Sequence, residues 1–195
     1  MSRKNISDDI DLFSLVNLTS GYRVQDFECD IKEYELFIKN DALQFQELNI
    51  ARTYLLINKT NADIVAYMSL VSDSIRLSEQ ERGYTFPATI LFSSFPAIKI
   101  GKLAVSKPYK EIYKGIGSLM IELARGIAEE INQSVACKFI TVDADVENDP
   151  KLPEFYGKNS FVFNEAYNRG SNRRTISMRL NILNDEQDVV EHTGT

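Results

Sequence analysis

The chain of 195 residues is long enough for one domain of ordinary size with its own hydrophobic core. Its formal net charge is −6, so it lacks the overall basic excess that is typical of nucleic-acid-binding proteins. It contains two cysteines and a single histidine, His192, near the C-terminal end. This composition excludes histidine-based metal sites and Ser-His or Cys-His nucleophilic triads, and we expect no metal cofactor.

The sequence favours a cytoplasmic protein with no membrane partner. No apolar stretch is long enough to cross a bilayer, and the polar first eleven residues lack the apolar segment of a secretory signal. Cys29 and Cys137 lie in segments that look apolar or structured, which favours a reducing compartment over a disulfide bridge. We expect residues 1–10 to form a flexible arm, residues 11–183 a single domain, and the acidic residues 184–195 a tail.

The first half of the domain is predicted to contain a helix and a β-hairpin. The helix begins near Asp30, which can act as its N-cap, and places Tyr34 on an inward stripe. The β-type runs 53–58 and 64–71 are separated by a short turn, which predicts a hairpin. Residues 73–96 have mixed character, and we expect them to form a loop that covers a site and contributes to an acceptor pocket.

Residues 98–105 are predicted to form a strand with an unusual pattern. Its apolar side chains occupy even positions at first and odd positions afterwards. One extra residue, a β-bulge at Gly101 or Lys102, would produce this change of face. A strand that is buried on both faces would give the same pattern, and the sequence leaves both interpretations open.

The second half of the domain alternates helices and strands. Apolar residues recur with helical spacing from 116 to 131, and the run 135–142 is continuously apolar, as in a central strand covered on both faces. A strand, a helix and an apolar strand in succession predict a parallel pair of strands. A short helix at 150–159 and strands at 161–164 and 175–182 complete a mixed α/β domain.

Glycines and lysines precede the long helix. Gly115 and Gly117 allow the backbone to approach a ligand closely, and the unpaired amides of the helix's first turn point towards an anion. Lys110 and Lys114 add positive charge suitable for a pyrophosphate. A simple loop turn would need the same glycines, so phosphate binding rests on their position between a strand and a strongly periodic helix.

Two further groups are candidates for proton transfer. Tyr156 follows the apolar strand, and a tyrosine, with an ordinary pKa of about 10, remains a proton donor at neutral pH. The alternative is a half-buried tyrosine whose hydroxyl is already hydrogen-bonded. Four carboxylates at the end of the same strand could remove a proton from an attacking amine or could simply form a solvated strand end. They are Asp143, Asp145, Glu147 and Asp149.

Between residues 12 and 182 these segments resemble the GNAT acetyltransferase superfamily, whose fold is a mixed, centrally splayed β-sheet flanked by helices. Leu103-Ala104-Val105 looks like the family's acetyl-CoA strand, whose edge amides bind the pantetheine arm and the acetyl carbonyl. Gly115 and Gly117 match the family's Arg/Gln-x-x-Gly-x-Gly/Ala pyrophosphate loop.

Further residues extend the resemblance to the reaction centre. Phe155-Tyr156, with Lys158 and Phe161, resembles a family signature whose tyrosine is the usual general acid, and this implies that role for Tyr156. Asn148 lies near the place of a CoA-contacting asparagine. The residues expected to bind the donor are Leu103, Ala104, Val105, Lys110, Lys114, Gly115, Ile116, Gly117, Ser118 and Asn148.

The sequence departs from the family pattern in the pyrophosphate loop. Ile112 stands where the family has Arg or Gln, so the first pyrophosphate ligand is missing or is replaced by Lys110. The link from Val105 to Gly115 looks about two residues longer than is usual, and Ser160 replaces the common glycine before Phe161.

The resemblance implies direct transfer of an acetyl group from acetyl-CoA to a primary amine, either a small molecule or a peptide, and many such proteins form homodimers. One alternative is a GNAT toxin that acetylates aminoacyl-tRNA and is neutralised by an antitoxin. Segments similar to those toxins are Phe27-x-Cys29, Tyr34, Phe37-Ile38 and Ala42. The acidic composition argues against a tRNA substrate. A catalytically silent CoA-binding module is the third interpretation.

Overall fold

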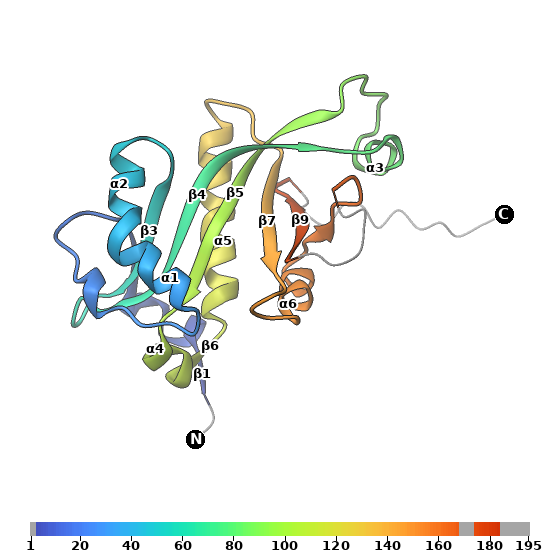
Figure 1. Cartoon of the computed structure of the whole chain (residues 1–195). Helices are drawn as coiled ribbons and strands as arrows, with labels where there is room; N and C mark the ends of the chain where they lie inside the picture. Colours follow the sequence, from blue (N-terminus) through green and yellow to red (C-terminus); the bar gives the residue numbers. More distant parts are fainter. Residues whose placement is uncertain (1–2, 168–173, 184–195) are drawn as a thin grey trace.

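A central seven-stranded sheet organises the molecule. The computed structural model describes residues 3–167 and 174–183. The sheet contains, in spatial order, β2 (Phe13–Asn17), β3 (Arg52–Asn58), β4 (Ile64–Arg76), β5 (Ser94–Val105), β7 (Phe139–Asp145), β9 (Thr175–Asn181) and β8 (Val162–Phe163). A two-stranded ladder pairs β1 (Lys4–Asn5) with β6 (Tyr113–Lys114). Figure 1 shows this ladder beside the start of the long helix α5 (Ile116–Asn132). The mixed α/β class expected from the sequence is confirmed.

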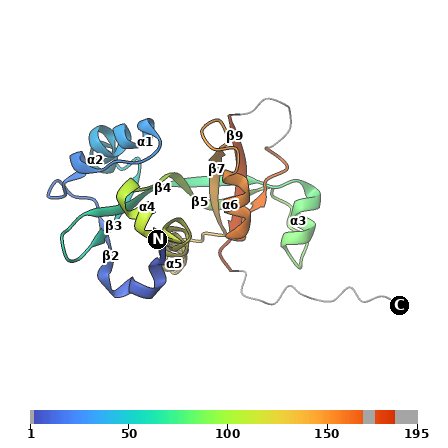
Figure 2. The same cartoon turned by 90° about the horizontal axis from the view of Figure 1, so that it is seen from below.

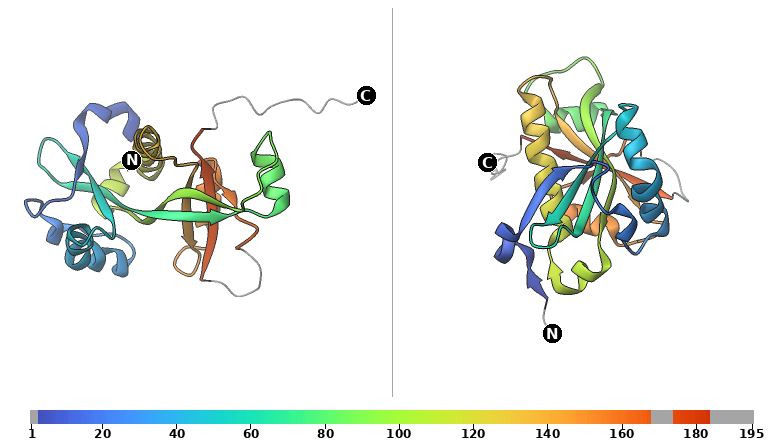
Figure 3. Two further views of the ribbon diagram at one scale, coloured as in Figure 1. Left: turned by 90° about the horizontal axis from the view of Figure 1, so that it is seen from above. Right: turned by 90° about the vertical axis from the view of Figure 1, so that its left-hand side faces the viewer.

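Helices cover both faces of the sheet. They are α1 (Lys32–Leu36), a π-helical turn (Phe37–Asp41), α2 (Ala42–Glu47), α3 (Glu79–Thr85), α4 (Lys107–Ile112), α5 (Ile116–Asn132) and α6 (Leu152–Lys158), with 3₁₀ turns at Ile6–Leu12 and Val24–Asp26. The helices α1 and α2 lie on one face of the sheet and α5 on the other, as Figures 2 and 3 show. None of the helices in the described ranges has the length and apolar character needed to cross a membrane.

Alternation along the strands gives each face its own core. On β4, Tyr67 packs in the cluster beneath α1 and α2, whereas its neighbour Met68 packs in the cluster that contains α5. Both side chains are fully buried. Because successive side chains of a strand point to opposite faces, one strand supplies both cores. The apolar stripe of α5 completes the second core through Met120 and Ala124, which are also buried.

The two halves of the sheet are joined by a short parallel contact. β5 pairs with β7 only through Ala97–Lys99 against Phe139–Thr141. Beyond these residues β5 stays paired with β4, whereas β7 stays paired with β9. The β4–β5 register shifts by one residue next to Ser69, which leaves Gly101 as the extra residue. This confirms the bulge and decides between the two interpretations of the 98–105 pattern.

Several boundaries differ from the sequence prediction. The first helix begins at Lys32 with Ile31 as its cap residue, because the Asp30 carboxylate instead accepts a hydrogen bond from Lys110. The strand predicted from residue 135 begins at Phe139, since Val135 lies in an exposed turn after α5.

The segment 73–96 is not a covering loop. It continues β4, forms α3 and begins β5 at an end of the sheet remote from α1 and α6 (Figure 1). Its apolar side chains share a small separate core with Ala97 and Phe139, in which Phe86 stacks on Phe95 with 4.7 Å between ring centroids. The mixed composition therefore reflects an extended hairpin carrying a helix.

The N-terminal residues are also more ordered than expected. Lys4 and Asn5 pair in parallel with Tyr113 and Lys114, and Ile6 is 1% exposed in the main core. A few apolar residues, Ile6, Ile10 and Leu12, scattered in a polar stretch were too weak a signal to predict this anchoring. Residues 4–12 thus pack on the domain, whereas the predicted acidic tail, 184–195, lies outside the described residues.

A buried ion pair joins α3 to β9, the strand next to the edge strand β8. Glu81 of α3 accepts a hydrogen bond of 2.7 Å from Arg179 of β9, and the two side chains are 4% and 9% exposed. Burial alone would raise the pKa of Glu81. Hydrogen bonds from Ser78 and the charge of Arg179 outweigh that effect and hold the pKa below its ordinary value.

We predict that Glu81→Gln destabilises the domain by about 3 kcal/mol at neutral pH, because it leaves the Arg179 charge buried without its partner. The folded-state pKa of Glu81 is lowered, so its contribution is complete at neutral pH and is lost as the pH falls through that pKa. Urea denaturation should therefore show the variant and wild type converging below about pH 4. Glu79→Gln, at an exposed position in the same helical turn, is the control and should have little effect. An equal loss in both variants would contradict this account.

Candidate active site

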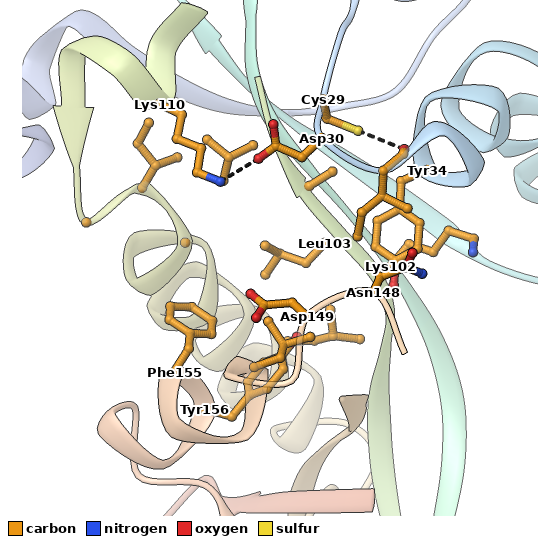
Figure 4. Close-up of a pocket in the computed structure, with 18 of the residues that line it drawn as sticks. Cys29, Asp30, Tyr34, Lys102, Leu103, Lys110, Asn148, Asp149, Phe155 and Tyr156 are labelled. Atoms are coloured by element: carbon orange, nitrogen blue, oxygen red, sulfur yellow. Dashed lines mark hydrogen bonds and ion pairs between the residues drawn. The ribbon is translucent and has the colours of Figure 1, made fainter. Parts of the chain in front are cut away.

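A cavity of about 630 Å³ opens where β5 and β7 separate. Its walls come from α1, β5, the loop that leads into α5, the segment after β7, and α6 (Figure 4). The sequence-predicted residues that line it are Leu103, Ala104, Val105, Lys110, Lys114, Gly115, Ile116, Gly117, Asn148 and Tyr156. Ser118, in the first turn of α5, is half-buried and does not line the cavity. The segment 73–96, expected in an acceptor pocket, contributes nothing to it.

The open edge of β5 forms one wall. In the described part of the chain no strand pairs with this edge beyond Lys99, although the other edge is paired with β4 as far as Val105. In a strand paired along one edge, alternate residues direct their N–H and C=O groups to the other edge. The backbone around Leu103 can therefore hydrogen-bond a molecule that lies along the strand.

The start of α5 depends on two glycines, its N-cap Gly115 and Gly117 in its first turn. Gly115 has φ 85°, a left-handed conformation that disfavours side chains, and a Cβ there would lie 3.2 Å from the Asn5 Oδ1 atom. A Cβ on Gly117 would lie 2.9 Å from Cζ of Phe155, another residue that lines the cavity. Gly115 is the N-cap of α5 and supplies no side-chain cap. The first amides of this 17-residue helix thus lack a capping side chain and lie at the cavity wall.

Basic residues also line the cavity. Lys110 is paired with Asp30 at 2.5 Å, and Lys102 is paired with Glu33 at 2.7 Å. Lys114 has no carboxylate partner among the described residues. Arg3 also lines the cavity, which sequence reasoning missed because the N-terminal segment looked like a solvated arm.

Tyr156 is a buried residue of the cavity wall. The residue is 7% exposed, and its hydroxyl makes no hydrogen bond with any residue that the structure describes. This differs from the alternative in which the hydroxyl is already satisfied. Burial, followed by the neighbouring Tyr34, raises the pKa of Tyr156. The side chain is therefore a protonated donor that faces the cavity throughout the neutral range.

Tyr34 is a second tyrosine in the cavity wall. Burial and the charge of Asp145 raise its pKa to about 12, and its hydroxyl lies 3.5 Å from Asp145 Oδ2. The Lys102 ammonium lies 4.5 Å from the centre of the Tyr34 ring. The sequence placed Tyr34 on an inward stripe, and helical periodicity alone could not distinguish a residue of the core from one at the cavity wall.

The four candidate carboxylates have local partners. Asp143 pairs with Lys99 at 2.8 Å, and Asp145 accepts a hydrogen bond of 2.7 Å from Asn148 Nδ2. Asp149 accepts a hydrogen bond from the Lys151 amide, while Glu147 pairs with Arg174. Asp143 and Asp149 line the cavity. Among the described residues, no cluster of histidine, cysteine, aspartate and glutamate is suited to a metal ion.

Comparison with known proteins identifies the fold. No protein-family model matches the sequence, and no curated protein matches it significantly. The chain is similar to a solved bacterial toxin (18% identity, 87% of this chain and 90% of that chain, TM-score 0.72). It is also similar to AtaT complexed with acetyl-methionyl-tRNAfMet (18% identity, 87% of this chain and 94% of that chain, TM-score 0.69). A third similar structure is a tyrosine-to-phenylalanine mutant of KacT (16% identity, 86% of this chain and 95% of that chain, TM-score 0.68). The GNAT-type fold expected from the sequence is confirmed.

Two glycines of α5 allow a matched test of the packing at the cavity wall. Gly126→Ala meets no atom within 4 Å and should stabilise the domain by up to about 1 kcal/mol through helix propensity. Gly117→Ala should lose that gain, because its methyl group forces the Phe155 ring to move. Urea denaturation of both variants would measure the difference, which we expect to be about 1 kcal/mol or more. Equal stabilisation by both substitutions would show that Phe155 is not packed on Gly117.

Proposed function

We propose that the chain is an N-acetyltransferase that uses acetyl-CoA as its donor. The observation that carries the proposal is the single cavity that joins an unpaired strand edge, an uncapped helix start and a free tyrosine hydroxyl. These groups match the three parts of the donor, which are a pantetheine amide chain, a pyrophosphate and a thiolate leaving group. The similar solved structures include AtaTR bound with AcCoA, which supports the same donor for this chain.

The donor would lie across the mouth of the opened sheet. Its pyrophosphate is bound by the amides at the start of α5, where the helix dipole favours negative charge, together with Lys114. Its pantetheine arm runs along the open edge of β5 and hydrogen-bonds the backbone between Leu103 and Val105. Asn148, on the opposite wall, contributes a further polar contact.

Transfer is direct in this proposal. The neutral nitrogen of the acceptor amine attacks the thioester carbonyl, forming a C–N bond. A backbone N–H near Leu103 stabilises the negative oxygen of the tetrahedral intermediate, an effect typically worth a few kcal/mol. The C–S bond then breaks, and Tyr156 donates its proton to the leaving thiolate. The nitrogen loses its excess proton to solvent, and no covalent enzyme intermediate forms.

We propose that the acceptor is the amino group of an aminoacyl-tRNA rather than a small amine or a peptide terminus. The similar structures support this choice, since AtaT was solved with acetyl-methionyl-tRNAfMet and with the C-terminus of the antitoxin AtaR. The net charge of −6 means that tRNA would have to dock on a local group of cations. An antitoxin would then be the protein partner.

We predict that Tyr156→Phe reduces acetyl transfer by about 10²-fold or more while acetyl-CoA binding is retained, because only the proton donor is lost. Turnover is measured by thiol release, and binding by calorimetry. Tyr84→Phe, at a position that is 80% exposed, is the control. Because burial raises the pKa of Tyr156, wild-type turnover should not fall through loss of this proton up to about pH 10. Full turnover by Tyr156→Phe would remove the residue from the mechanism.

The acceptor is tested by incubating the protein with labelled acetyl-CoA and aminoacylated tRNA. We expect label on the aminoacyl group, no label on the same tRNA without its amino acid, and arrest of translation in a cell-free extract. Transfer only to small amines or peptide termini would overturn the tRNA proposal but retain the acetyltransferase. Binding of acetyl-CoA without transfer to any amine would support a silent binding module instead.

A further inference from the structure

Arg3 brings a positive charge to the end of the cavity where α5 begins. It lines the cavity beside Lys110 and Lys114, and one of its guanidinium nitrogens donates to the Lys110 carbonyl at 3.3 Å. No carboxylate of the described chain lies within ion-pair distance of Arg3. Lys110 and Lys102, by contrast, are neutralised by Asp30 and Glu33.

The β1–β6 ladder determines where this charge lies. The parallel register places Lys4 against Tyr113 and Asn5 against Lys114. Arg3 therefore lies just before β1, and the partner strand β6 leads directly into Gly115. Successive side chains of a strand alternate in direction. Lys4 pairs with Asp9 at 3.5 Å, whereas Asn5 approaches Gly115 and Arg3 reaches the cavity.

The anchor of this ladder is buried. Ile6 packs in the main core at 1% exposure, and the Tyr113 hydroxyl donates to Asp9 Oδ2 at 2.9 Å. The backbone that follows Arg3 is thus held to the segment before α5 by the β1–β6 ladder and by the bond between Tyr113 and Asp9. Ile112, which immediately precedes β6, is apolar, so that position supplies no competing charge.

We propose that Arg3 binds a phosphate group of the donor, together with Lys114 and the first amides of α5. This inference rests on the proposed acetyl-CoA donor and adds a residue from the N-terminal strand to its site. The guanidinium still has free N–H donors after its bond to Lys110, and its planar fork matches two phosphate oxygens. The phosphate belongs either to the pyrophosphate or to the 3′-phosphate of the adenosine.

The test is calorimetric titration of the full chain with coenzyme A at about 50 mM and about 500 mM salt, where the Debye lengths differ several-fold. We expect Arg3→Gln to raise the Kd about 10-fold at low salt and clearly less at high salt. Arg3→Lys should have an intermediate effect, since it keeps the charge but loses the fork. Arg52→Gln, the same change at an exposed residue outside the cavity, should leave the Kd unchanged.

Dephospho-coenzyme A, which lacks the 3′-phosphate, distinguishes the two phosphate positions. If Arg3→Gln weakens coenzyme A but not the dephospho form, Arg3 binds the 3′-phosphate; if it weakens both, Arg3 binds the pyrophosphate. An unchanged Kd, or an equal loss at both salt concentrations, would overturn the inference. Absence of binding by the wild type would instead overturn the proposed function itself.

Discussion

The separation of β5 from β7 is the constraint on which the rest of the structure depends. Three residue pairs hold the parallel contact, and beyond them each strand keeps only its outer neighbour. A backbone edge within a folded domain must find other hydrogen-bond partners, and here it borders a cavity instead of a strand. The Gly101 bulge lies two residues beyond Lys99, the last residue of β5 that pairs with β7, and so lies where the two halves diverge.

The helices that pack on the sheet supply functional groups to the cavity between β5 and β7. Helix α5 packs on the sheet and places its N-terminus, which lacks a capping side chain, at the cavity wall. Helix α6 provides the hydroxyl of Tyr156. The contact between Tyr34 and Asp145 spans the opening, because one residue belongs to α1 and the other to the end of β7. The site therefore combines groups from both halves, and its geometry depends on the angle between them.

The structural features that could be predicted from the sequence are those that produce strong local patterns of residues. The apolar periodicity of α5, the change of face at Gly101 and the glycines before α5 each correspond to an observed feature. Single contacts between distant segments were not predictable, such as the burial of Ile6 or the pairing of Glu81 with Arg179. These contacts depend on which surfaces meet after folding, and no periodicity encodes that.

The ladder between β1 and β6 affects how the protein can be handled. Arg3 lies at the cavity wall, so any peptide fused directly ahead of Arg3 begins at that wall. Such a fusion adds bulk and charge beside Arg3, and we expect it to change ligand affinity without substituting any residue of the cavity. Affinity tags and fluorescent fusions are for this reason better placed away from the N-terminal side of Arg3.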